Sequence, residues 1–255
     1  KFKEKVQTIY IDPPFNTGND FDYVDRFQDS SWLSLMKDRI SRSKNYLAPD
    51  GKFYIHLDHN ADYLGRILFN DIFDNNFVNE IFIKRVKKSD PNLNRMNVAI
   101  ECILLYGNTE KYKLNPLVKE ISEKEYWHAL DAPGQGEARI FFGKKINPPK
   151  GRHWQWTQQK IDDAINKGII RLNPNTGRPE YLVKAGREIL FDNDWTDLQS
   201  YSFQWDFQTE KNEFILKRVI ESGSNVKDLI FDFFLGSGTT TAVAHKLGRK
   251  WIGVE

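Results

Sequence analysis

Apolar residues along this 255-residue chain alternate between two spacings over most of its length. Short apolar runs, typical of strands, occupy residues 8–11, 52–58, 77–85 and 98–106. Apolar residues at helical spacing occupy residues 32–47, 60–73 and 207–224. Residues 228–255 then read as strand, glycine turn, helix and strand. This alternation predicts a doubly wound α/β fold, with a mostly parallel sheet covered by helices.

Turn residues and apolar positions refine two of these helices. Pro49-Asp50-Gly51 is expected to end the first helix. The helix at 207–224 is expected to bury four apolar residues, Phe214, Leu216, Val219 and Ile220.

The periodicity breaks down between residues 109 and 194, in a stretch rich in turn residues. Its aromatic and basic side chains include Trp127, Lys144, Lys145, Lys150, Arg152, Trp154 and Trp156. Two interpretations stay open: a loop-rich insertion with scattered surface charge, or a basic, aromatic surface for nucleic acid. The chain therefore divides into residues 1–108, an insertion at 109–194, and residues 195–255.

Composition narrows the class of protein. No apolar run approaches the roughly 20 residues of a membrane helix, and the start lacks a signal-peptide pattern, so we expect a cytoplasmic protein without a membrane partner. The chain starts at Lys1, not at a methionine, and stops at Glu255 at the end of an expected strand. We therefore expect it to be a piece of a longer protein.

Cysteine and histidine usage gives no support for a metal site. The single cysteine, Cys102, excludes an internal disulfide and a Cys-rich zinc site, and it is expected to be buried in its strand. The five histidines lack metal-ligand spacing. His56 and His59 bracket Asp58, for which a helix-capping turn is favoured over a metal site. The net charge of +2 permits a polyanionic partner, so any DNA contact must come from local clusters.

The first chemical motif lies in "IYIDPPFNTGNDF", where a strand runs into an acid, two prolines and an aromatic residue. Pro13 and Pro14 lack the backbone N–H that a strand needs, so the strand stops at Asp12. Open α/β sheets bind ligands at the carboxyl ends of strands, which would display Asp12 and Phe15. A strand end closed by a turn is the alternative.

The second motif lies in the expected strand, glycine turn and helix near the end of the chain. Gly236 and Gly238 allow a tight turn and close backbone approach, and the helix that starts at Thr239 and Thr240 offers free N–H groups. Glu255 follows about 20 residues after Gly236, the offset at which an acid binds ribose hydroxyls. The third glycine of the dinucleotide fingerprint is absent. A nucleoside cofactor without a pyrophosphate therefore fits better than NAD.

Together, Asp12-Pro13-Pro14-Phe15 and Phe234-Leu235-Gly236-Ser237-Gly238 resemble the motifs of amino-methylating DNA methyltransferases that use S-adenosylmethionine. The chain most resembles the modification subunit of type III restriction-modification systems and related adenine methyltransferases. Residues 32–73 and 207–213 add to the match. Phe233 departs from the pattern, because the family commonly has proline there.

The resemblance implies transfer of a methyl group to the N6 amine of a flipped-out adenine. The Asp12 carboxylate and the Pro13 carbonyl would accept the amine hydrogens, Pro14 would stiffen the loop, and Phe15 would stack on the extruded base. The cofactor residues implied by the family are Phe234, Gly236, Gly238, Thr239, Thr240, Glu255 at the ribose, and Lys211 on the methionine side. An exposed lysine at a helix end is the alternative for Lys211.

The resemblance also assigns roles to the three parts. Residues 1–108 would form the catalytic half, 109–194 a target-recognition insertion, and 195–255 the cofactor-binding half. Double-stranded DNA is the implied partner, with a restriction subunit and a second copy of the chain as further candidates.

Two clusters are candidates for DNA contact. The candidates for phosphate contact are Lys84, Arg85, Lys87, Lys88 and Arg95. The alternative interpretation of this cluster is a solvated surface loop. For sequence reading they are Arg152 and Trp154.

Three other functions remain open: methylation of cytosine N4, methylation of RNA, and a catalytically inactive DNA-recognition subunit.

Overall fold

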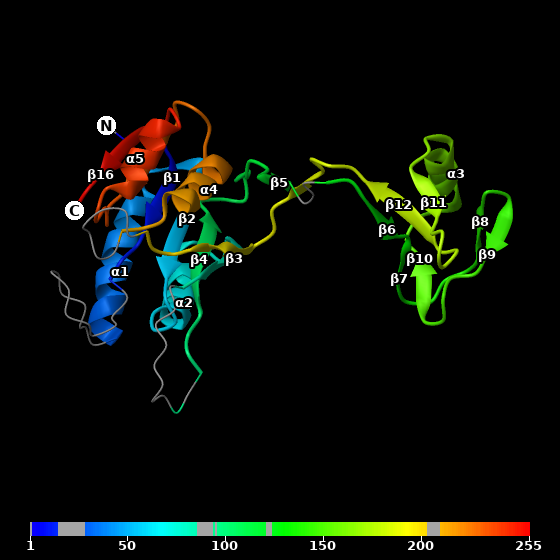
Figure 1. The fold of residues 1–255 in the computed structure, drawn as a ribbon. Helices are drawn as coiled ribbons and strands as arrows, with labels where there is room; N and C mark the ends of the chain where they lie inside the picture. Colours follow the sequence, from blue (N-terminus) through cyan, green and yellow to red (C-terminus); the bar gives the residue numbers. More distant parts are fainter. Residues whose placement is uncertain (1, 15–28, 86–93, 95, 121–123, 203–209) are drawn as a thin grey trace. The chain divides into compact units, whose positions relative to one another are not determined.

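The computed structural model describes residues 2–14, 29–85, 94, 96–120, 124–202 and 210–255 (Figure 1). The chain forms two compact units. Unit 1 combines Lys1–Leu117 with Phe191–Glu255, and unit 2 is Val118–Leu190. Each helix in the part of the chain that the structure describes is too short or too polar to span a bilayer.

Unit 1 is built on a seven-stranded sheet in the order β14-β3-β4-β2-β1-β15-β16. Its strands are β1 (Val6–Ile11), β2 (Leu47–Leu57), β3 (Phe77–Lys84), β4 (Ile100–Gly107), β14 (Asp194–Gln199), β15 (Leu229–Asp232) and β16 (Lys250–Gly253). Strand β4 is antiparallel to β2 and β3, and the other neighbours are parallel. The predicted doubly wound, mostly parallel sheet is confirmed.

Four helices cover the two faces of this sheet: α1 (Asp29–Lys44), α2 (Asp62–Ile72), α4 (Glu213–Gly223) and α5 (Thr239–Lys246). Alternate residues of each strand point to opposite faces. On β1, Ile9 and Ile11 pack in a core with α1 and α2. Tyr10, between them, packs in a second core with α4 and α5. The sheet is therefore buried on both faces, which explains the continuous apolar runs in its strands.

The carboxyl edge of the sheet gathers the ends of β1, β2, β3, β14 and β15, together with the start of the antiparallel β4. Strand β1 lies between β2 and β15. The strands that follow β1 directly in the sequence are added on its β2 side, and the last two strands, β15 and β16, are added on its other side. Ligands of open α/β sheets bind at such a switch point. The loops after β1 and β15 therefore lie side by side at the expected place.

The end of α1 differs from the sequence prediction. Helix α1 ends at Lys44, and β2 already begins at Leu47, so Pro49-Asp50-Gly51 lies inside β2. The N–H of Tyr46 bonds to the carbonyl of Ser43 and closes the helix, and Leu47 then pairs with Val6. The register between β1 and β2 shifts after this pair, which accommodates the proline and glycine.

The buried face of α4 also differs by one residue. Phe214 is 64% exposed, whereas Ile215 is fully buried with Leu216, Val219 and Ile220. Asn212 caps the helix and accepts the N–H of Phe214, which places Phe214 on the outer side of the first turn. The prediction for Phe214 was wrong, and those for the other three residues are confirmed.

Unit 2 is more regular than the sequence suggested. Its described residues form the helix α3 (Gln158–Asn166) and the strands β5 (Val118–Glu120), β6 (Tyr126–Ala129), β7 (Asp131–Pro133), β8 (Arg139–Phe141), β9 (Lys144–Ile146), β10 (Arg152–Trp154), β11 (Ile170–Leu172), β12 (Pro179–Val183) and β13 (Glu188–Leu190). Its own apolar core includes Leu130, Phe141, Trp154, Ile161, Ala164 and Ile170. Most of these strands have three residues, too few to show an alternating pattern.

Candidate active site

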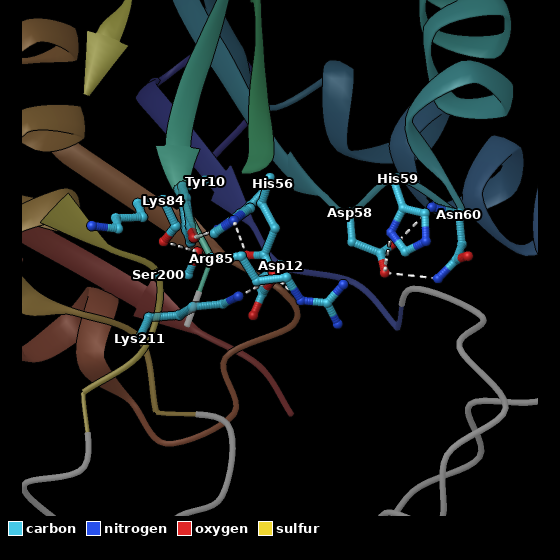
Figure 2. Close-up of polar contacts among 11 residues, drawn as sticks. Tyr10, Asp12, His56, Asp58, His59, Asn60, Lys84, Arg85, Ser200 and Lys211 are labelled. Atoms are coloured by element: carbon cyan, nitrogen blue, oxygen red, sulfur yellow. Dashed lines mark hydrogen bonds and ion pairs between the residues drawn. The ribbon is translucent and has the colours of Figure 1, made fainter. Parts of the chain in front are cut away.

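The loop after β1 presents Asp12 at the carboxyl edge of the sheet. Its carboxylate Oδ1 lies 2.9 Å from Lys211 Nζ, and the two side chains are 20% and 7% exposed. Figure 2 shows the lysine reaching Asp12 from the segment before α4. Burial lowers the pKa of Lys211, but Asp12, Tyr201 and Glu101 outweigh it and raise the pKa above its ordinary value. The alternative of an exposed lysine at position 211 was therefore wrong.

Helix α1 anchors the same loop from the other side. Trp32 is 1% exposed, and its Nε1 donates a 2.7 Å hydrogen bond to the Pro14 carbonyl. Two successive prolines already restrict the backbone, and this bond connects their end to the core. Pro13 lies between the Asp12 and Pro14 anchors. Phe15 lies outside the described residues.

A buried polar network continues inward from the Asp12 loop (Figure 2). His56 Nε2 lies 3.1 Å from Glu101 Oε2, and His56 Nδ1 lies 3.1 Å from the hydroxyl of Tyr10. Arg85 Nε lies 3.5 Å from the other Glu101 oxygen. Burial raises the pKa of Glu101, but hydrogen bonding to His56 and the charge of Lys211 reverse this and lower the pKa to about 2. Glu101 is therefore a charged group in the protein interior.

Six separate segments contribute to this constellation. Its members are Tyr10 and Asp12 at the end of β1, His56 on β2, Glu101 on β4, Arg85 after β3, Ser200 after β14 and Lys211 before α4. Tyr10, Glu101 and Ser200 were not predicted from the sequence, and His56 was not assigned to a site. One signal was present: Glu101 is an acid inside the apolar run "VAIECILLY". A buried acid requires a partner, and here it has several.

The glycine loop lies after the neighbouring strand β15. Gly236 has φ 53° and Gly238 has φ 85°, a region of backbone space that favours glycine. Gly238 is the N-cap of α5, so Thr239 and Thr240 start the helix as predicted. A Cβ added to Gly238 would have one neighbour within 4 Å, Thr241 Oγ1 at 3.7 Å, so the space beside the loop is open.

Two acidic residues flank this loop. Glu255 Oε2 accepts the N–H of Gly236 at 2.6 Å; the residue lies beyond the end of β16 at Gly253. Asp232 accepts the N–H of Phe234 at 3.0 Å from the end of β15. Burial raises the pKa of Asp232 to about 7, although hydrogen bonds from Thr240 and Phe234 act in the opposite direction. The loop therefore offers an open side, helix N–H groups and a carboxylate, which fits the ribose and amino-acid parts of a nucleoside cofactor.

The predicted phosphate-binding cluster is described in part. Lys84 is exposed at the end of β3, and Arg85 is partly buried through its contact with Glu101. Lys87, Lys88 and Arg95 lie outside the described residues.

The predicted sequence-reading pair has other contacts within unit 2. Trp154 is 6% exposed, and its Nε1 donates to the Ile146 carbonyl at 3.1 Å. Arg152 forms an ion pair with Asp131. The Trp154 ring is therefore part of the core of unit 2, which leaves it no free face for a base.

His56 lies in β2, which ends at Leu57, and the turn before α2 starts after Asp58. Asp58 Oδ1 accepts the N–H of Asn60 at 2.9 Å, and the Asp58 carbonyl accepts the N–H of Asp62 at 3.0 Å. Among the residues that the structure describes, no group of three acidic, histidine or cysteine side chains could hold a metal ion. Cys102 is 5% exposed on β4, which confirms its predicted burial.

Sequence comparisons match almost the whole chain to one family. The N6/N4 methylase family, described as DNA methylase, matches residues 6–255. The type II methyltransferase M.EcaI of Enterobacter cloacae is 32% identical over 286 aligned positions, which cover 99% of this chain and 62% of M.EcaI. The probable type III restriction-modification enzyme HindVI Mod subunit of Haemophilus influenzae is 28% identical, covering 100% of this chain and 46% of the subunit. The chain thus spans about half of the length of these relatives.

Solved structures share the fold at low sequence identity. The PvuII DNA methyltransferase, described as cytosine-N4-specific, has a TM-score of 0.52 and 16% identity, covering 99% of this chain and 76% of that one. TTHA0409, a putative DNA modification methylase of Thermus thermophilus solved with S-adenosylmethionine, has a TM-score of 0.53 and 15% identity, covering 99% and 81%. The sequence match and the methyltransferase fold agree. This chain belongs to the N6/N4 family of DNA methylases.

Proposed function

We propose that this chain transfers a methyl group from S-adenosylmethionine to the N6 amine of adenine in double-stranded DNA, within a restriction-modification system. One observation carries the proposal: the Asp12 loop after β1 and the glycine loop after β15 lie at the ends of adjacent parallel strands. A methyl donor bound at one loop would therefore lie next to an amine bound at the other.

The amine needs assistance, because the nitrogen lone pair is delocalised into the base. The Asp12 carboxylate and the Pro13 carbonyl accept its two hydrogens, which directs the lone pair at the methyl group and stabilises the positive charge that develops on nitrogen. The base must leave the duplex to reach these acceptors. Phe15 stacks on the extruded base.

S-adenosylmethionine supplies an electrophilic methyl group on a sulfonium centre, so the new N–C bond would form as the C–S bond breaks, and the methylated nitrogen would then release one proton. Glu255 accepts hydrogen bonds from the ribose hydroxyls, a contact that would replace its bond to the Gly236 N–H. The first turn of α5, with Thr239 and Thr240, and the Phe234 and Gly238 backbone hold the amino-acid part.

Unit 2 and the basic segment after β3 serve DNA recognition in this proposal. Lys84, Arg85, Lys87 and Lys88 contact phosphates, and unit 2 reads sequence, with Arg152 on its β10 strand. A restriction subunit is a proposed protein partner, because the HindVI relative is described as the Mod subunit of a restriction-modification enzyme. A second copy of the chain is a further proposed partner.

Cytosine N4 is the second candidate target, because the family includes N4 methylases and the PvuII enzyme of similar fold is described as cytosine-N4-specific. The same geometry would serve either exocyclic amine. The acid at Asp12 favours adenine, since the cytosine N4 group tends to have serine there. Nucleoside analysis of DNA methylated by this chain decides between them: N6-methyladenine supports the proposal, and N4-methylcytosine overturns the adenine assignment.

Asp12→Ala tests the catalytic role directly. We expect a loss of methyl transfer of at least about 100-fold, because the principal amine acceptor is removed. S-adenosylmethionine affinity should stay within about threefold of wild type, since Asp12 is assigned to the target amine. Transfer of tritiated methyl groups into unmethylated plasmid DNA and titration calorimetry measure the two effects. An Asp12→Ala turnover within tenfold of wild type would contradict the assignment.

A further inference from the structure

Lys211 carries a buried positive charge next to the Asp12 carboxylate, which is the proposed acceptor of the amine hydrogens. Its side chain is 7% exposed, and its Nζ lies 2.9 Å from Asp12 Oδ1. Lys211 Nζ also lies 4.4 Å from the centre of the Tyr201 ring. Burial of a charged lysine lowers the stability of the fold unless an opposite charge compensates for the lost hydration. The Asp12 carboxylate provides that charge.

Glu101 supplies a second negative charge that acts on Lys211. Glu101 is itself fixed, because His56 Nε2 lies 3.1 Å from one of its oxygens and Arg85 Nε lies 3.5 Å from the other. The Glu101 side chain is 1% exposed, and the His56 side chain is fully buried. The negative charge that acts on Lys211 from the sheet is therefore held in place by His56 and Arg85.

We propose that Lys211 is a positioning residue for methyl transfer, which rests on the function proposed above. Lys211 occupies Oδ1 of Asp12 and holds the carboxylate in one orientation, so that Oδ2 faces the target amine. Glu101 holds Lys211 in turn. A close ion pair between two largely buried groups restrains the carboxylate, and a carboxylate fixed in advance needs no reorganisation during transfer.

This role differs from the one that the family resemblance implies for Lys211, which is contact with the methionine part of the cofactor. The two roles make opposite predictions. A cofactor contact affects S-adenosylmethionine affinity, whereas a positioning contact affects the rate constant of transfer when both substrates are saturating.

The experiment uses the full chain and three variants. Lys211→Met keeps the length of the side chain and removes its charge, Lys211→Arg keeps the charge, and Glu101→Gln removes the charge that faces Lys211. The control is Lys246→Met, which removes another lysine pair, with Glu213 Oε1 at 2.6 Å, where the lysine is 60% exposed. Single-turnover transfer of tritiated methyl from saturating S-adenosylmethionine into unmethylated plasmid DNA gives the rate constant. Calorimetry gives the cofactor affinity.

We expect Lys211→Met to lower the single-turnover rate constant by about 100-fold, with cofactor affinity within about threefold of wild type. The rate constant of Lys211→Arg should be about tenfold higher than that of Lys211→Met. Glu101→Gln should lower the rate constant about tenfold relative to wild type, and Lys246→Met should have the wild-type rate constant. If Lys211→Met does not fold, the Glu101→Gln rate with unchanged affinity carries the same test.

Three results would overturn the inference. A Lys211→Met chain that transfers at the wild-type rate under saturation gives Lys211 no positioning role. A tenfold loss of cofactor affinity with an unchanged saturated rate makes Lys211 a cofactor ligand. A wild-type chain that transfers no label overturns the proposed function and this role with it, whereas the first two results leave the proposed function standing.

Discussion

At the scale of single residues, the site depends on a few charged side chains held away from water. Glu101 stays ionised with a pKa of about 2, whereas burial raises the pKa of Asp232 to about 7. The difference lies in their partners. Glu101 faces His56 and Lys211, while Asp232 has the negative charges of Asp12 and Glu255 as neighbours. The pKa values of two carboxyl groups at one edge of the sheet are therefore shifted in opposite directions.

Asp232 makes the stability of the fold depend on pH. Because its pKa rises from 3.8 to about 7 on folding, its stabilising contribution is complete below pH 3.8 and is lost as the pH rises through 7. Wild-type protein should lose about 2 kcal/mol of unfolding free energy between pH 5 and pH 8 from this group. Asp232→Asn should remove most of that loss. Urea unfolding followed by tryptophan fluorescence at several pH values measures it.

The control for this prediction is Asp71→Asn on the exposed side of α2. It should leave the pH dependence of the unfolding free energy as in wild type. An Asp232→Asn protein whose unfolding free energy falls as steeply as that of wild type between pH 5 and pH 8 would show that Asp232 is ionised in the native state at neutral pH.

At the scale of elements, the site is held by helices that belong to different faces of the sheet. Helix α1 contacts the Asp12 loop through the bond from Trp32 to the Pro14 carbonyl, and the segment before α4 contacts Asp12 through Lys211. These helices pack in separate apolar cores. The described residues of the Asp12 loop, 12–14, are thereby held from both faces, although they follow the end of β1 at Ile11.

Trp32→Phe removes the indole N–H that reaches the Pro14 carbonyl and keeps an aromatic ring in the core. We expect a loss of about 1 to 3 kcal/mol in unfolding free energy and a lower rate constant of methyl transfer with nearly unchanged cofactor affinity, because the loop is less well held. Chemical unfolding and single-turnover assays measure these effects.

Trp195→Phe is the matched control, because Trp195 is also buried and its Nε1 donates to the Asp192 carbonyl at 3.1 Å, in unit 1 but outside the Asp12 loop. It should reduce stability without lowering the rate constant. If both substitutions lower the rate equally, the effect of Trp32 is on general stability and not on the loop.

At the scale of the whole molecule, the chain separates its proposed chemistry from its proposed DNA reading. Unit 1 holds both loops, and unit 2 has a separate apolar core. The N–H of Phe191 bonds to the carbonyl of Leu117 at 2.9 Å, so the two crossings between the units lie side by side on unit 1. Unit 2 is therefore inserted at one point and interrupts no strand of the main sheet.

Replacing Val118–Leu190 with a short flexible linker should leave unit 1 folded, because its two ends at this point are already adjacent. Calorimetry should find S-adenosylmethionine affinity within about threefold of the complete chain, and transfer of methyl groups to DNA should fall by at least about 100-fold if unit 2 supplies the recognition surface. Site-specific methylation that persists without unit 2 would assign sequence reading to unit 1.

Local sequence patterns were enough to predict the strands of the main sheet other than β14, the helices α1, α2, α4 and α5, and the two motif loops. Strand and helix periods depend on local spacing, and adjacent prolines or glycines act on the backbone where they stand. Asp12 at the end of β1 and Gly238 at the start of α5 were predictable for this reason. The core of unit 2 was not, because strands of three residues carry too little pattern.

The side-chain contacts of the site, by contrast, follow from the assembled fold. Lys211 was predicted either as a cofactor residue or as an exposed lysine. In the structure it forms an ion pair with Asp12, which is far away in the sequence. Glu101 and His56 come from antiparallel neighbours in the sheet, and Arg85 joins them from the end of a third strand. Such contacts depend on strand order and register, which a single sequence does not contain. The motifs were local, whereas the charged network that supports them exists only after the sheet has assembled.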